Sequence, residues 1–96
     1  MRPFRCVEVN IYYDDENKSA RFNPVMDPYS TYYFCNPTEM MDKLTKFQNG
    51  DVVLIDGQAY YECNYMYQAS NSPYYSNFYK AYMVTVSDVR EDLYGK

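Results

Sequence analysis

Tyrosine is the residue that most limits how this chain can fold. The 96 residues include 14 tyrosines and five phenylalanines, with no histidine and no tryptophan. One enclosed aromatic ring buries roughly 150–250 Å², so a core of this size cannot enclose every ring. Some rings must fill the core while others lie at its edge or on a surface. Tyrosine-dense segments suit a pleated sheet, where aromatic side chains pack well.

Three segments before residue 36 predict β-strands. Residues 4–13 alternate apolar with polar or smaller side chains, the period of a half-buried strand. A polar turn at residues 14–18 is followed by residues 20–23, which could return antiparallel before Pro24 interrupts the chain. Residues 29–35 are dense in Tyr, Thr and Phe and indicate a third strand. We expect Tyr13, Tyr33, Tyr61 and Tyr82 to contribute rings to the core.

A helix is predicted over about residues 37–48. Asn36 stands as N-cap, Pro37 takes the first helical position, and Glu39 could reach back to the cap. Met40, Leu44 and Phe47 then recur on one helical face, and Asn49-Gly50 supplies a left-handed stop. This apolar face needs a partner, and the sheet is the only large one available.

The second half of the chain predicts further strands. Strand-like residues 52–55 and 58–67 flank Asp56-Gly57, a pair typical of a two-residue type I′ hairpin turn. Residues 78–87 alternate again and fit a final strand. Asp88, with Glu91 three residues later, predicts a short capped turn of helix at the C-terminal end.

Together these elements predict an α+β fold in a single domain of residues 1–96. We expect a mainly antiparallel sheet of five to six strands, with the helix at about residues 37–48 packed on it. The alternative is a small SH3-like β-barrel, because residues 50–57 suit its meander.

The sequence contains no arrangement typical of catalysis or metal binding. The absence of histidine removes the commonest general base and transition-metal ligand. Cys6, Cys35 and Cys63 form no C-x-x-C pair, so we expect free, partly buried thiols rather than a disulfide framework or a zinc site. Residues 14–16 lack the spacing of a calcium loop. We therefore predict no enzymatic activity, no metal and no cofactor.

The charge balance bears on the partner. Nine basic residues stand against 13 acidic ones, giving a net charge of −4, and no cluster of Lys or Arg occurs. Phosphate binding depends on clustered cations, so direct nucleic-acid binding is disfavoured and a protein with a basic patch is favoured. Without an apolar leader or a membrane-length apolar run, we expect a cytoplasmic protein that contacts no membrane. Self-association through an uncovered aromatic sheet face stays open.

A change in composition marks the candidate contact surface. Between residues 64 and 82, tyrosines occur among Ser and Asn, a mixture typical of binding surfaces because tyrosine offers a large rigid contact area. The candidate partner-binding residues are Tyr65, Tyr67, Tyr74, Tyr75 and Tyr79. The competing interpretation is an ordinary loop held down by its own aromatic side chains.

Two functions from different classes follow. The first is a small non-enzymatic protein-binding module, of the kind that viruses and phages use as an inhibitor or accessory protein, docking on a host protein through a tyrosine-rich surface. The alternative is a small-ligand or nucleotide-binding protein that stacks its ligand on tyrosines.

Overall fold

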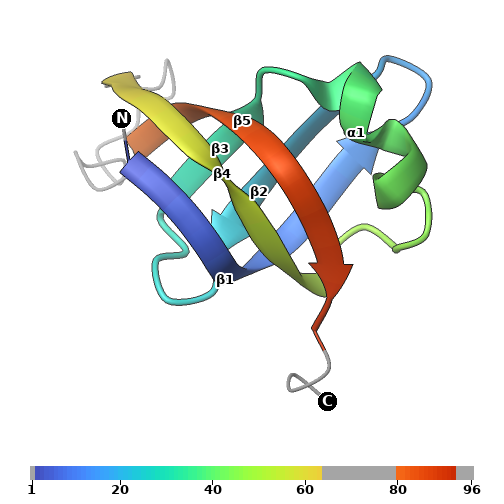
Figure 1. The fold of residues 1–96 in the computed structure, drawn as a ribbon, viewed down its shortest axis with the longest axis horizontal. Coiled ribbons are helices and arrows are strands. Elements are labelled where there is room, and N and C mark those ends of the chain that lie inside the picture. Colours follow the sequence, from blue (N-terminus) through green and yellow to red (C-terminus); the bar gives the residue numbers. More distant parts are fainter. Residues whose placement is uncertain (1, 64–79, 93–96) are drawn as a thin grey trace, which may run out of the picture.

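The computed structural model describes residues 2–63 and 80–92, which form a closed barrel of five strands with one helix (Figure 1). The elements in chain order are β1 (Arg2–Asp14), β2 (Ser19–Pro24), β3 (Ser30–Phe34), α1 (Pro37–Leu44), β4 (Val52–Cys63) and β5 (Lys80–Glu91). Around the barrel the strands follow the order β1-β2-β3-β5-β4, and β4 closes the barrel against β1.

The connections make this a Greek-key barrel. Strands β1, β2 and β3 pair in sequence as antiparallel neighbours, and β4 then returns to lie antiparallel beside β1; this spatial order defines the Greek key. Strand β5 fills the remaining gap, antiparallel to β4 and parallel to β3. The predicted sheet is thus confirmed in part, because it has five strands and one parallel pair, and it closes. The small-barrel alternative is compatible with this closure.

Strand β1 follows its predicted alternation, with one irregularity at Cys6. Val9 and Ile11 are fully buried, and Val7 packs at the edge of the core. At Cys6 the backbone adopts a positive φ of 51°, and the pairing with β4 shifts register between Phe4 and Val7. Such a bulge bends the strand and increases its twist, which helps a small barrel to close.

The predicted hairpin at Asp56-Gly57 is wrong, because β4 runs through both residues as one strand. Gly57 does not adopt a positive φ. Instead, a Cβ added at Gly57 would lie 3.1 Å from Val86 Cα and closer still to the Thr85 carbonyl oxygen. The pairing of β4 with β5 also shifts register between Asp56 and Gly57. The glycine therefore permits a close backbone approach at a bend in the barrel.

The short helical turn predicted after Asp88 is also wrong, because β5 continues as a strand to Glu91. Val89 pairs with Ile55 and is buried in the core. Asp88 caps nothing. Its carboxylate instead forms ion pairs with Lys43 (2.7 Å) and Arg90 (3.0 Å). Burial of Val89 and pairing with β4 therefore override the local capping pattern.

The helix begins where predicted but ends earlier, at Leu44 rather than near residue 48. Asn36 occupies the N-cap position without a side-chain cap bond. Its amide pairs instead with the backbone of Val86, donating from Nδ2 to the carbonyl oxygen (2.8 Å) and accepting at Oδ1 from the N–H (3.0 Å). Gly50 does take a positive φ of 95°, in the connection from α1 to β4. Asn36 thus fastens the start of α1 to β5.

Stacked aromatic rings occupy the barrel interior. Tyr32 is fully buried, stacked against Phe22 on one side (5.0 Å between ring centroids) and Tyr82 on the other (4.5 Å). Phe4 meets Tyr32 edge-on at 4.9 Å. Of the tyrosines expected in the core, Tyr13 and Tyr82 pack against it, Tyr33 is only half-buried, and the side chain of Tyr61 lies outside the described residues. The aromatic stack therefore accounts for some of the 14 tyrosines of the chain.

Candidate functional site

The predicted partner-binding residues Tyr65, Tyr67, Tyr74, Tyr75 and Tyr79 all lie outside the described residues, so their surface stays a prediction. The described residues contain other features that bear on function: an exposed apolar turn, an aromatic face with one arginine, an ion-pair cluster, and a carboxyl pair.

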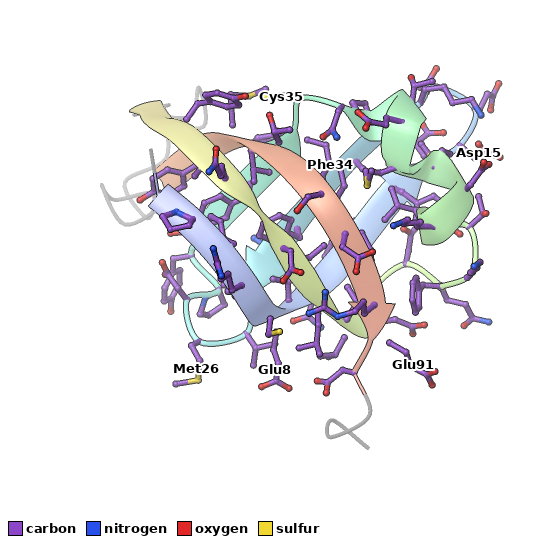
Figure 2. All side chains as sticks on the ribbon, in the orientation of Figure 1. Glu8, Asp15, Met26, Phe34, Cys35 and Glu91 are labelled. Atoms are coloured by element: carbon purple, nitrogen blue, oxygen red, sulfur yellow. The ribbon has the colours of Figure 1, made fainter. Side chains whose placement is uncertain are left out.

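The exposed apolar turn connects β2 to β3. Val25, Met26 and Tyr29 expose 40%, 91% and 56% of their surface, and they account for three of the five exposed large hydrophobic residues found in the described part of the chain. Tyr60 and Val52, the other two, lie on β4. We call Val25, Met26 and Tyr29, with the neighbouring acids Glu8 and Asp27, the β2–β3 rim. Figure 2 shows Met26 and Glu8 along the same edge of the barrel.

The backbone of this turn is held firmly although its apolar tips are exposed. The Val25 N–H donates to the Glu8 carbonyl oxygen of β1 (2.9 Å). The Ser30 hydroxyl donates to Asp27 Oδ2 (2.6 Å), and Asn23 Nδ2 donates to the Ser30 carbonyl oxygen (2.9 Å). The apolar side chains are therefore presented from a fixed turn, which lowers the entropy lost when a partner binds.

The outer face of β1, β2 and β3 carries an aromatic row around one arginine. Tyr12 pairs in register with Arg21, and Arg21 pairs with Tyr33. The Arg21 guanidinium lies over the Tyr12 ring, with Cζ 4.4 Å from the ring centroid. Both tyrosines are half-buried, whereas Arg21 is exposed. A hollow of about 360 Å³ adjoins this row, between the β1–β2 turn and Asn49.

An ion-pair cluster joins β4, β5 and α1. Arg90 donates to Asp56 (2.6 Å) and to Asp88 (3.0 Å), while Lys43 donates to Asp88 (2.7 Å). The Arg90 hydrogen bond lowers the pKa of Asp56 below its usual value, and hydrogen bonds from Lys43 and Arg90 lower that of Asp88. Asp56 and Asp88 face each other across the two strands, so the arginine relieves a like-charge contact. Neutralising the facing carboxylates of Asp56 and Asp88 thus gives the ion-pair cluster a structural role.

Two of the three cysteines differ from expectation in their exposure, and the side chain of Cys63 lies outside the described residues. Cys6 and Cys35 are free, as predicted, but both are exposed rather than partly buried. Arg90 Nη2 lies 2.8 Å from Cys6 Sγ. Among the described residues, no group of three or more Cys, Asp or Glu side chains has the arrangement of a metal site. Nor does any helix there have the length and apolar character required to cross a membrane.

No protein-family model, curated protein or solved structure matches this chain. Its function must therefore be argued from its own residues.

A carboxyl pair links β1 to the end of β5. The pKa of Glu8 is raised above its usual value, because the protonated Glu8 carboxyl group donates a hydrogen bond to the buried Asp92 carboxylate, and because the charge of Asp92 and some burial also disfavour ionised Glu8. Two carboxyl groups that share a hydrogen bond repel each other when both are ionised, so the form with one proton between them is favoured.

We expect the Glu8–Asp92 pair to oppose folding at neutral pH. Because the pKa of Glu8 is raised in the folded state, folding is favoured when Glu8 is protonated, and this stabilisation is lost as the pH rises through the folded pKa. Glu8→Gln, which is uncharged, should raise the urea midpoint at pH 7 and have little effect at pH 4. Glu16→Gln, on the exposed β1–β2 turn, is the control. Equal effects of Glu8→Gln at both pH values would contradict the pairing.

The rim and the aromatic row were both missed by the sequence analysis. Val25, Met26 and Tyr29 could have been noticed as apolar residues in a segment containing two prolines. Their exposure could not have been predicted, because it depends on which side chains the barrel closes over. The Tyr12–Arg21–Tyr33 row has no local signal, since its members are far apart in the sequence and only strand register unites them.

Proposed function

We propose that this chain is a small non-enzymatic protein-binding module that docks on a protein with a basic patch. The observation that carries the proposal is the β2–β3 rim, where three exposed apolar side chains stand together on a hydrogen-bonded turn. Exposed apolar patches rimmed by polar residues are typical of protein-interaction sites.

The side chains of the rim fit such a role. Met26 is unbranched and polarisable, which lets it adapt to an irregular partner surface. Tyr29 combines a large contact area with a hydroxyl group that can hydrogen-bond, as the tyrosines of binding surfaces do. These two residues would form the centre of the contact.

The charges beside the rim favour a basic partner. Glu8 and Asp27 are exposed next to the apolar tips, and the chain as a whole carries a net charge of −4. Acidic residues around an apolar contact steer a basic patch into register and raise the association rate more than the final affinity. The tyrosine-rich residues Tyr65, Tyr67, Tyr74, Tyr75 and Tyr79 are proposed as a second part of the contact surface. An inhibitor of the viral or phage type would have this profile.

The test measures binding to one purified partner. The tagged chain is used to capture proteins from a cell lysate, the captured protein is purified, and its dissociation constant is measured for each variant. Met26→Asp should weaken binding by about tenfold or more, because a charge then has to be desolvated at the centre of the contact. Val52→Asp introduces the same charge at another exposed apolar residue and should leave the affinity unchanged.

Two results would contradict the proposal. One is a purified partner that binds the wild-type and Met26→Asp chains equally well, which would exclude the β2–β3 rim from the contact surface. The other is unchanged binding by the Tyr74→Ala and Tyr75→Ala variants, which would exclude the tyrosine-rich segment from the contact surface. Sedimentation of the purified chain tests self-association separately, since a dimer through the rim would be disrupted by Met26→Asp and not by Val52→Asp.

A further inference from the structure

The outer face of β1, β2 and β3 differs in chemistry from the rest of this acidic chain. Its first row is Tyr12, Arg21 and Tyr33, joined by the strand register. The next row toward the β2–β3 turn is Asn10, Asn23 and Thr31, in which Asn10 pairs with Asn23 and Asn23 Nδ2 donates to Thr31 Oγ1 (3.0 Å). Neither row contains a carboxylate, although Asp14 follows two residues after Tyr12 on the same face of β1. The two rows together present aromatic rings, neutral polar groups and one positive charge.

Arg21 is held in a position suited to an anion. Its guanidinium group lies over the Tyr12 ring at 4.4 Å, and a planar guanidinium stacked on an aromatic face keeps its N–H edge available for hydrogen bonding. That edge matches two oxygens of a phosphate group in a bidentate contact. The stacking also limits the rotamer freedom that Arg21 would lose on binding.

The neighbouring hollow has the size of a single small ligand. Its volume is about 360 Å³, and its lining includes Tyr12, Arg21, Tyr33 and Asn49. One carboxylate, Asp14, also lines it and accepts hydrogen bonds from the backbone N–H groups of Glu16 and Asn17 and from Asn17 Nδ2. Pockets for small molecules run from about 300 to 1,000 Å³, so this hollow lies at the small end of that range. Among the described residues that line the hollow, Arg21 is the one cationic side chain and Asp14 the one carboxylate, which suits one phosphate group rather than a polyanion.

We infer that the Tyr12–Arg21–Tyr33 row binds a nucleotide, with the base stacked on Tyr33 and the phosphate held by Arg21. A base stacks on an aromatic side chain whatever its identity, because every base has a π-face. Arg21 supplies the counter-charge that stacking alone lacks. The Ser19 hydroxyl group, which lines the hollow, offers a hydrogen bond to the sugar or the base edge.

This site is separate from the proposed docking surface. Its residues belong to the outer face near the β1–β2 turn, whereas the rim belongs to the β2–β3 turn. A variant of one can therefore be tested without altering the other, and each proposal can fail alone.

The experiment titrates the full chain with adenosine monophosphate and follows backbone amide signals by heteronuclear NMR. Saturable shifts should centre on Tyr12, Arg21 and Tyr33. Adenosine and inorganic phosphate, each supplying half of the ligand, should bind more weakly than the intact nucleotide. Arg21→Gln should weaken binding about tenfold, because it removes a charge-assisted bidentate contact. Tyr33→Leu should have an effect of similar size through lost stacking. Thermal unfolding of each variant checks that the fold is retained.

The matched controls are Arg5→Gln and Tyr60→Leu, which change an exposed arginine and an exposed tyrosine outside this face and should leave the affinity unchanged. The site is refuted by the absence of saturation, by shifts centred elsewhere, or by unchanged affinity in Arg21→Gln. A single-stranded oligoadenylate serves as the comparison ligand. If it binds much more tightly than its number of nucleotides accounts for, a site for one nucleotide is wrong and a strand-binding surface replaces it.

Discussion

Replacing Gly57 by alanine is expected to destabilise the barrel by about 3 kcal/mol, because the new methyl group would overlap the backbone of β5. A Cβ at this position would lie 3.1 Å from Val86 Cα and closer still to the Thr85 carbonyl oxygen. These are backbone atoms of a neighbouring strand, so no rotamer change can relieve the overlap. Strands β4 and β5 would have to separate where their register shifts. The measurement is the urea midpoint and slope of unfolding.

Gly50→Ala is the matched control for Gly57→Ala. Gly50 needs its positive φ of 95°, but the nearest atom to an added Cβ is Tyr12 Cε1 at 4.0 Å. Space is therefore available, and the cost is that of a left-handed backbone in a residue with a side chain, about 1–2 kcal/mol. If Gly57→Ala proves no more destabilising than Gly50→Ala, close approach is not the reason for a glycine at position 57.

Replacing Phe22 by alanine should destabilise the chain by about 4 kcal/mol. Phe22 is fully buried and its ring contacts those of Phe4, Tyr32 and Phe34 at centroid distances of 6.1, 5.0 and 6.0 Å. Removing the ring would leave a cavity between residues of β1, β2 and β3, which the closed barrel cannot easily collapse. The free energy of unfolding of a small domain is about 5–15 kcal/mol. The Phe22→Ala variant would therefore retain little stability.

Phe47→Ala provides the comparison for Phe22→Ala. Phe47 is only half-buried and lies after the end of α1, packed at the edge of the core. Solvent can occupy much of the space that its ring leaves, so the loss of stability should be clearly smaller. Denaturant unfolding of both variants measures the difference. Similar losses would mean that the aromatic stack is not the centre of the core.

The local elements were predictable where one residue's environment follows from its neighbours in the chain. The alternation of Val7, Val9 and Ile11 predicted β1, and Pro37 with the apolar face of Met40 and Leu44 predicted α1. These patterns succeed because the strand and helix periods decide which side chains share a face. The helix end at Leu44 was missed, since loop residues such as Phe47 can also pack on the core.

The two wrong predictions, the hairpin at Asp56-Gly57 and the helical turn after Asp88, share a physical cause. Asp-Gly is a strong turn signal because glycine tolerates a positive φ, but glycine also allows two backbones to approach closely. The sequence pattern is the same in both cases. At Gly57 the neighbouring strand that makes the difference is β5, and its residues Thr85 and Val86 come almost thirty positions later in the printed sequence. Asp88 shows the same limit, because Lys43 and Arg90 take the carboxylate expected to cap a helix.

From the amino-acid pattern it follows that this chain builds strands around one short helix, that its tyrosines exceed what a small core can hold, and that histidine chemistry is absent. These conclusions depend on composition and local period. Only the three-dimensional pairing of the strands shows that the sheet closes into a Greek-key barrel, that Tyr32 lies at the centre of an aromatic stack, and that Tyr12, Arg21 and Tyr33 form one row. Strand register and closure bring together residues that are distant in the chain, and no local pattern records that choice.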